Sequence, residues 1–283
     1  MEYLIDLQNV SKTYKNFKLE GINFKLPKGC IMGFIGENGA GKSTTIKLIL
    51  DIVKKESGNI KVLGHDNTKL SKELQEKIGV VLDECCLPEN LNVKEINQVF
   101  SAMYKTWDKN KFMDFISRFK LPEKKAVKEF SKGMKMKLTI ATALSHATEL
   151  LILDEATSGL DPIIRDEILD VFLEFIQEES HSILLSSHII SDLEKVCDYI
   201  CFIHQGNIIF TENKDDLLER YGVLKCSLTE FQSMNQNFIK GYRKNTYGVE
   251  ALVEKDKFKG KYVVDDASLE DIMLFYIKGG KIK

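Results

Sequence analysis

Proline is scarce in this chain, and neither sign of charge dominates it. Only 4 of the 283 residues are proline, so no Pro-rich linker separates modules, and the length allows one or two domains. Lys and Arg total 40 against 42 Asp and Glu, which gives a formal net charge of −2. Because nucleic-acid-binding domains usually carry a basic excess, this balance gives no reason to expect nucleic acid as a partner. The hydrophobic content of 43% is typical of a globular protein and excludes long disordered regions.

Long apolar runs are also missing. The best candidate, residues 138–153, is interrupted by His146 and Glu149 and is rich in Thr, Ala and Ser. A membrane-spanning helix needs about 20 predominantly apolar residues, so we expect that the chain does not cross a membrane by itself. The first six residues contain no basic segment and no long apolar core, which predicts that no signal peptide is present.

Cysteines are few and scattered, at positions 30, 85, 86, 197, 201 and 226. Cys197 and Cys201 are four residues apart, but no second pair stands at the spacing of a zinc site. We therefore expect reduced, buried thiols in a cytosolic protein.

Hydrophobic periodicity predicts strands that alternate with helices. Strands are expected at residues 4–9, 22–25, 31–35, 78–82, 150–153, 183–186 and 199–203, and helices at 46–53, 112–119 and 164–175. Asp161 is a plausible N-cap for the last of these helices, with Pro162 in its first turn. Alternating strands and helices indicate an α/β fold with a largely parallel sheet. Few strand signals occur at residues 84–147, which we interpret as a helical insertion.

A glycine-rich segment carries the most specific chemistry. Residues 36–43 read Gly-Glu-Asn-Gly-Ala-Gly-Lys-Ser and match the phosphate-loop pattern G-x-x-x-x-G-K-[ST] between an apolar strand and an amphipathic helix. Glycines allow backbone N–H groups to surround phosphate oxygens, and the helix N-terminus adds partial positive charge. Lys42 can reach the β- and γ-phosphates, and the Ser43 hydroxyl can bind Mg²⁺.

The apolar strand at residues 150–153 ends in two acids, Asp154 and Glu155. A carboxylate at this place can hold the coordination shell of Mg²⁺, and its neighbour can polarise a water molecule. With the phosphate loop, this pair indicates a nucleotide-hydrolysing site.

Further segments then resemble those of ATP-binding cassette (ABC) proteins. Residues 130–134, Phe-Ser-Lys-Gly-Met, resemble the family's signature, and residues 158–161, Ser-Gly-Leu-Asp, look like its D-loop. His188 looks like the switch histidine, Tyr14 like the aromatic residue that stacks on adenine, and Asp83 stands in place of the Q-loop glutamine. The resemblance covers about residues 1–213.

The resemblance implies a fold and a domain organisation. The expected α/β fold has a phosphate-loop core with a mixed, mainly parallel sheet, antiparallel N-terminal strands and an inserted helical subdomain. A small C-terminal α+β extension follows. The nucleotide-binding domain would span residues 1–213, with the helical subdomain at about 84–147, and residues 214–283 would form an accessory region whose role stays open.

The resemblance also implies roles for individual residues. Glu155 would be the general base, His188 would contact the γ-phosphate, and Lys42 would stabilise its charge. Ser43, Asp83 and Asp154 would hold Mg²⁺. ATP would be bound by Tyr14, Gly36, Asn38, Gly39, Ala40, Gly41, Lys42, Ser43 and Thr44. Phe17 is an alternative to Tyr14 as the adenine-stacking residue.

Two cassettes of this family pair head to tail, so that each ATP contacts the phosphate loop of one and the signature of the other. Ser131 and Gly133 would thus face the partner's γ-phosphate, and Asp161 would couple the two sites. The alternative for Ser131 is a helix N-cap alone, and the surrounding lysines fit a solvated face. Whether the second cassette is a second copy or a paralogue is open.

Two positions depart from the family pattern. Lys132 replaces the first glycine of the signature, although its side chain can point away from the phosphates. Asp83 replaces a glutamine, which adds negative charge beside the triphosphate, and Glu84 is the alternative at this position.

The function that this resemblance implies is that of a Mg²⁺-dependent ATPase subunit that powers a membrane transporter. It would lie in the cytoplasm, peripheral on the inner face of the cell membrane, bound to integral membrane subunits. The signature variant and the tail resemble subunits of bacterial exporters for antibiotics and peptides. A soluble ABC ATPase that acts on ribosomes or DNA, and a nucleotide-binding regulator with low turnover, remain as alternatives. The transported substrate and its direction are not encoded in the motifs.

Overall fold

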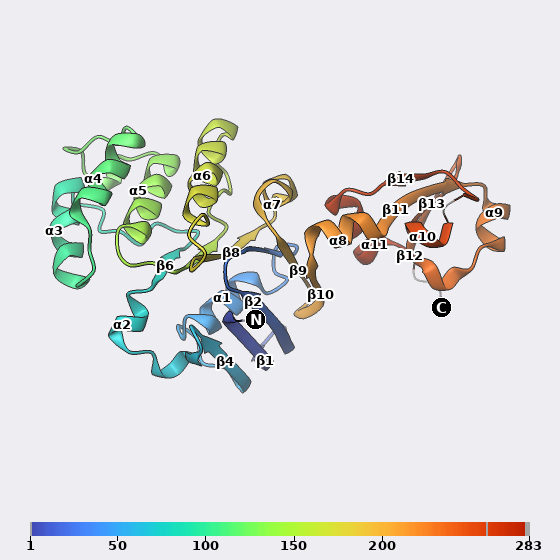
Figure 1. Ribbon diagram of the computed structural model, residues 1–283, viewed down its shortest axis with the longest axis horizontal. Helices are drawn as coiled ribbons and strands as arrows, with labels where there is room; N and C mark the ends of the chain where they lie inside the picture. The colour runs from blue at the N-terminus through green and yellow to red at the C-terminus, as the bar shows by residue number, and fades with distance from the viewer. Residues whose placement is uncertain (1, 259, 281–283) are drawn as a thin grey trace. The chain divides into compact units, whose positions relative to one another are not determined.

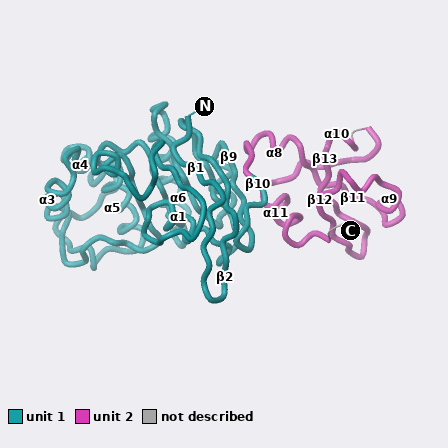
Figure 2. The backbone as a smooth tube through the Cα atoms, turned by 90° about the horizontal axis from the view of Figure 1, so that it is seen from below, with its two compact units in different colours: residues 1–210 teal, residues 211–283 magenta. Residues whose placement is uncertain are grey.

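The computed structural model describes residues 2–258 and 260–280. These residues form two compact units, residues 1–210 and residues 211–283, which Figure 2 draws in different colours. The boundary falls within the strand β10 (Asn207–Asn213). The first unit contains two sheets and the second contains one, and each unit has its own hydrophobic cluster.

The first unit contains most of the secondary structure. Its strands are β1 (Tyr3–Tyr14), β2 (Phe17–Pro27), β3 (Ile31–Ile35), β4 (Ser57–Val62), β5 (His65–Asp66), β6 (Ile78–Val81), β7 (Leu150–Asp154), β8 (Ser182–Ser187) and β9 (Tyr199–His204), followed by β10. Its α-helices are α1 (Lys42–Ile49), α2 (Lys72–Gln75), α3 (Val93–Met103), α4 (Lys109–Arg118), α5 (Lys132–Leu144), α6 (Pro162–Phe175) and α7 (Ile190–Val196). Short 3₁₀ helices span Asn67–Lys69 and Val127–Glu129.

Two sheets build this unit. The core sheet has the strand order β10-β9-β3-β8-β7-β6, and its β3–β9, β3–β8, β7–β8 and β6–β7 pairs are parallel. The other sheet has the order β2-β1-β4-β5, and its pairs are antiparallel. The predicted fold class, a mainly parallel core with antiparallel N-terminal strands, is confirmed.

The core sheet brings the ends of three strands to one edge. Ile35 at the end of β3 pairs with Ser187, and Asp154 at the end of β7 pairs with Ser186. Every residue of β3, β7 and β8 is buried, which explains why apolar residues follow one another without alternation at 31–35, 150–153 and 183–185. The segments that follow β3, β7 and β8 therefore emerge side by side.

Helix α1 is shorter than its apolar spacing predicts. It ends at Ile49, and not at Val53. The amide of Asn67 donates hydrogen bonds to the carbonyls of Leu48 (2.8 Å) and Ile49 (3.2 Å), and Asp51 has a φ of 55°. A distant side chain thus satisfies carbonyls at the end of the helix, and the left-handed residue turns the chain away.

Helices α3, α4 and α5 lie together at one side of the first unit (Figure 1). In α4 the periodic Phe112 and Ile116 are buried, and Asp108 caps the helix by accepting from two backbone N–H groups. Helix α6 begins as predicted, because Asp161 accepts from the N–H groups of Ile163 and Ile164, and Pro162 stands in the first turn. No helix in the described part of the chain combines the length and the apolar character needed to cross a membrane.

The second unit is a small α+β structure. It contains α8 (Lys214–Arg220), β11 (Tyr221–Cys226), α9 (Leu228–Ser233), β12 (Ile239–Asn245), β13 (Gly248–Glu254), α10 (Lys255–Phe258), β14 (Val264–Asp266) and α11 (Leu269–Lys278), with a 3₁₀ helix at Gln236–Phe238. The sheet order is β12-β13-β11-β14, with antiparallel pairs. Ser227 and Ser268 begin α9 and α11 as capping boxes.

The expectation that all the cysteines are buried is wrong for three of the six. Cys86 is exposed, and Cys85 and Cys226 are partly exposed, although all six are free thiols. Cys85 and Cys86 lie in the loop after β6, where the chain leaves the core sheet for the surface. Cys30, by contrast, is buried, and its burial raises the pKa of the thiol to about 12.

Candidate nucleotide-binding site

The phosphate loop connects β3 to α1, as its sequence predicts. Gly41 has a φ of 118° and stands at the N-cap of α1. A Cβ atom there would lie 2.5 Å from the side chain of Leu19, so glycine is required by both conformation and space. No side chain caps the helix, so its first N–H groups remain available to an anion.

Lys42 is the buried cation of the site. Its side chain is only 5% exposed, and its Nζ donates to the carbonyl of Gly36 at 2.7 Å. The same Nζ lies 3.1 Å from Oε1 of Glu155. The loop's own carbonyls and one carboxylate thus hold the ammonium group in place.

Glu155 follows the last residue of β7. Its backbone N–H donates to the carbonyl of Ser186 at 3.1 Å, and its φ is 53°. Its Oε2 lies 2.6 Å from Nδ1 of His188, which follows β8. Glu155 therefore contacts both Lys42 and His188, which were predicted from separate motifs, because β3, β8 and β7 are neighbours in the sheet.

Asp154, the residue before Glu155, is also buried. It is 4% exposed, and its Oδ1 accepts a hydrogen bond of 2.7 Å from the hydroxyl of Ser186. Ser186 carries no local sequence signal for this role, because its partner Asp154 is 32 residues away.

Lys42 and Glu155 border a cavity of about 520 Å³, a size typical of small-molecule sites. It is lined by Asn16, Phe17, Asn38, Gly39, Gly41, Lys42, Ser43, Thr44, Asp83 and Glu155. At the Q-loop position, Asp83 contributes to the wall, and Glu84 does not.

The aromatic residue in this wall is Phe17, the alternative from the sequence, and not Tyr14. Tyr14 ends β1, is 43% exposed, and carries Lys12 5.7 Å from the centre of its ring. Tyr14 and Phe17 lie opposite each other across the tight turn between β1 and β2. Because the two aromatic residues are this close in the chain, the sequence alone does not show which ring faces the cavity. Asn16, in that turn, was missed by sequence reasoning.

The signature residues lie elsewhere. Ser131 caps α5 by accepting from the N–H of Met134 at 3.3 Å, and Gly133 is buried against Ile164 of α6. Asp161 caps α6. Among the described residues that line the cavity, none of Ser131, Gly133 and Asp161 is present. One chain thus does not bring its own signature to its own phosphate loop.

The helix after His188 is anchored by a buried acid. Asp192 of α7 is 5% exposed, and Arg165 of α6 lies 3.6 Å from it. Burial raises the pKa of Asp192, while the guanidinium of Arg165 opposes that shift. This contact connects α6 to α7, next to the histidine of the site.

Comparison with known proteins agrees with this geometry. A family model described as ABC transporter matches residues 19–158. The chain is similar to the bacitracin transport ATP-binding protein BcrA of Bacillus licheniformis, with 35% identity over 84% of this chain and 77% of that protein. It is also similar to the lantibiotic transport ATP-binding protein SrtF of Streptococcus pyogenes, with 37% identity over 75% of this chain and 92% of that one.

A similar solved structure is that of an ATP-binding subunit of an ABC transporter. It has a TM-score of 0.69 and 27% identity, and the match covers 76% of this chain and 91% of that one. The match with relatives at 35% identity or more, over more than two thirds of their length, extends well beyond the phosphate loop.

Proposed function

Because the chain belongs to the ABC transporter family and is an ATP-hydrolysing subunit, we propose that it powers a bacterial exporter of antibiotics or antimicrobial peptides. The relatives that support this substrate class are named for bacitracin and lantibiotic transport. The observation that carries the ATPase chemistry is that Glu155, at the cavity wall, contacts both Lys42 and His188.

The proposed chemistry is largely positioning and charge stabilisation, as is usual for phosphoryl transfer. Lys42 and the N–H groups of the loop and of α1 would bind the phosphates. Glu155 would orient and deprotonate the attacking water, and His188 would hold the Glu155 carboxylate and contact the γ-phosphate. Phe17 would contact the base, since its ring lines the cavity.

The oxygen donors at this site suit Mg²⁺. Ser43 and Asp83 line the cavity, and Asp154 is a buried carboxylate whose hydrogen bond comes from a neutral hydroxyl. Hydroxyl and carboxylate oxygens are the ligands that Mg²⁺ accepts in phosphate sites. Bound there, the ion would neutralise charge on the phosphate oxygens.

The partners follow from the placement of the signature. Since Ser131 and Gly133 lie away from the cavity of their own chain, they would serve the cavity of a second cassette, either a second copy or a paralogue. Transport requires integral membrane subunits, which would hold this chain on the inner face of the cell membrane.

The test is purification of the tagged chain from detergent-solubilised membranes of its own cell, followed by reconstitution with the membrane protein that accompanies it. We expect ATP-dependent transport of a bacitracin-type or lantibiotic-type peptide by wild-type vesicles and none by Glu155→Gln vesicles. Association with ribosomes or DNA in place of a membrane protein would refute the exporter proposal. ATP-dependent transport of an unrelated substrate would refute only the substrate class.

A further inference from the structure

A buried lysine connects the signature helix α5 to α6, two helices that lie side by side (Figure 1). Nζ of Lys137 donates a hydrogen bond of 2.6 Å to Oε2 of Glu167, and the side chain of Lys137 is only 11% exposed. The same ammonium group lies 5.5 Å from the centre of the Phe119 ring. The expectation that the lysines around the signature form a solvated face is therefore wrong for Lys137.

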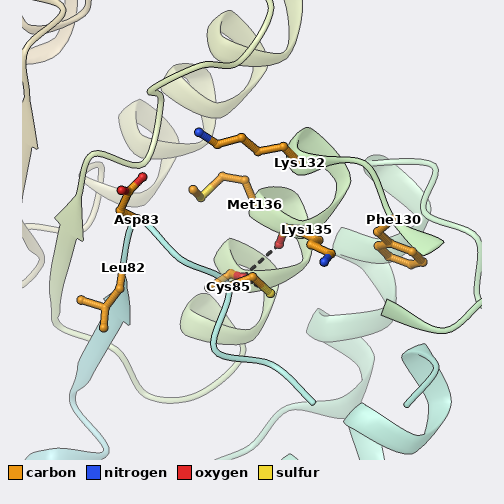
Figure 3. A pocket seen from close by; sticks show the side chains of 8 residues that line it. Leu82, Asp83, Cys85, Phe130, Lys132, Lys135 and Met136 are labelled. Carbon is orange, nitrogen blue, oxygen red and sulfur yellow. Dashed lines mark hydrogen bonds between the residues drawn. The ribbon is translucent and has the colours of Figure 1, made fainter. Parts of the chain in front are cut away.

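The other lysines of α5 have different surroundings. Lys132 and Lys135 line a cavity of about 290 Å³ together with Asp83, which reaches it from the loop after β6 (Figure 3). Nζ of Lys135 lies 3.4 Å from Oε1 of Glu89, and 25% of the Lys135 side chain is exposed. Lys137, by contrast, is held by an acid of α6, so its charge lies at the contact between the two helices.

This ion pair continues a contact that begins at the first turns of both helices. A Cβ atom at Gly133 would lie 2.8 Å from Cδ1 of Ile164, so the glycine allows the two helices to approach closely at this end. Gly133 and Lys137 are four residues apart and share one face of α5. Ile164 and Glu167 are three residues apart and share one face of α6. The helices therefore contact each other at two successive turns.

The starts of α5 and α6 carry residues that we expect to face a second cassette. Ser131 caps α5 and Asp161 caps α6, and both residues are exposed. A second cassette that contacts both of them requires a fixed distance between the two helix starts. Lys137 and Glu167 each stand six residues after these caps, where their ion pair restrains that distance.

We propose that Lys137 is a positioning residue, which through Glu167 holds the signature helix against α6 so that Ser131 and Asp161 meet a second cassette together. This rests on the proposed role of the signature toward a second cassette. Neither Lys137 nor Glu167 is among the described residues that line the nucleotide cavity of their own chain. Binding of ATP to the phosphate loop should therefore not depend on the pair, whereas hydrolysis that requires the signature should.

The test is a double-mutant cycle between Lys137→Met and Ser131→Ala. Phosphate release is measured in the complete transporter complex, and ATP affinity is measured on the full chain by calorimetry. Lys137→Met keeps an unbranched chain beside Phe119 but removes the ammonium group, so it should lower the hydrolysis rate about tenfold and change ATP affinity less than about twofold. In the Ser131→Ala background it should lower the rate less than about threefold further, because the group that Lys137 positions is already absent.

Two further comparisons separate this role from a general loss of charge or packing. Lys135→Met is the matched control, because it removes a charge from the same helix and breaks only the surface pair with Glu89, so the rate should change less than about twofold. Glu167→Gln should lose less rate than Glu167→Met, because the amide oxygen can still accept a hydrogen bond from the ammonium group.

Several outcomes would overturn the proposal. These are an equal loss of rate in Lys135→Met, full multiplication of the two losses in the double variant, and a fall in ATP affinity as large as the fall in rate. Wild-type hydrolysis in Ser131→Ala would refute the role of the signature on which the proposal rests. A complex that fails to transport peptides would refute the exporter proposal alone, because the cycle measures ATP hydrolysis and not transport.

Discussion

Glu155→Gln is the substitution that most directly tests the hydrolytic role of the site. The side chain is 13% exposed and accepts from Lys42 at 3.1 Å and His188 at 2.6 Å, so the amide has the same shape but loses the charge and the basicity. Glu155 belongs to the wall of the cavity, but the phosphate loop does not depend on it for its conformation, since the loop is held by Gly41 and by carbonyls that Lys42 contacts.

Because Glu155 acts in hydrolysis and the phosphate loop keeps its conformation without it, the substitution should reduce the rate much more than the ATP affinity. General-base catalysis typically contributes about 10²–10⁴ in rate, so the turnover number should fall by this factor. At 1.36 kcal/mol per tenfold change, the loss corresponds to about 3–5 kcal/mol of activation free energy. The affinity for ATP should change less than about threefold, because a neutral amide removes repulsion of the γ-phosphate while Lys42 remains.

The assay is phosphate release under saturating ATP in the complete transporter complex, with ATP affinity measured separately by calorimetry. Glu149→Gln is the matched control, because Glu149 precedes the same strand at its opposite end and pairs with Lys77 at 2.7 Å on the surface. That variant should hydrolyse ATP within about twofold of wild type, as surface charge pairs contribute little. Wild-type turnover in Glu155→Gln, or a loss of ATP affinity as large as the loss of rate, would refute the assigned role.

Three further outcomes are expected. Lys42→Ala should reduce phosphate release by about 10²–10³, because one preorganised positive group is lost where negative charge accumulates; near-normal hydrolysis would contradict the site. Asp83→Gln should keep or slightly raise the hydrolysis rate, since it restores a neutral ligand, whereas complete loss with intact ATP binding would show that a carboxylate is required. The third outcome concerns pH. Burial lowers the pKa of the His146 imidazole below its ordinary value of 6.5 in the folded protein. The contribution of this histidine to the free energy of unfolding is therefore present above pH 6.5 and is lost as the pH falls through the folded-state pKa. Thermal unfolding should therefore show a drop in stability on acidification that is smaller in His146→Asn, and an equal drop in both proteins would exclude this cause.

The parts of the fold that the sequence predicts well are those fixed by burial. The strands at 31–35, 150–154 and 182–187 are buried along their whole length, and apart from Asp154 only apolar or small residues occupy them. The start of α6 was also predictable, because an N-cap and a first-turn proline are local signals. Buried strands and helix starts depend on residues that are adjacent in the chain, so they can be recognised from the sequence alone.

The features that were missed depend on distant residues. Strand β2 extends over Phe17–Pro27 because it pairs with β1 along nearly its whole length, although polar residues interrupt the apolar pattern at both ends. Strand β4 contains Gly58 and Asn59, which have low strand propensity, and it is held by β1. The end of α1 is determined by Asn67, 18 residues after Ile49. In each case a long-range partner overrides the local preference.

The site itself shows the same division. Its motifs name Lys42, Glu155 and His188 separately, but only the order of β3, β8 and β7 in the sheet brings them into contact. These three residues follow neighbouring strands of a buried parallel sheet, so their spacing is constrained by ladder hydrogen bonds and core packing together. Asp83 follows β6, at the edge of that sheet, and its loop leads into the helical region that ends with α5. The candidate catalytic residues are thus held by the middle of the sheet, whereas Asp83 lies at its edge, where the chain leaves the sheet for the helices.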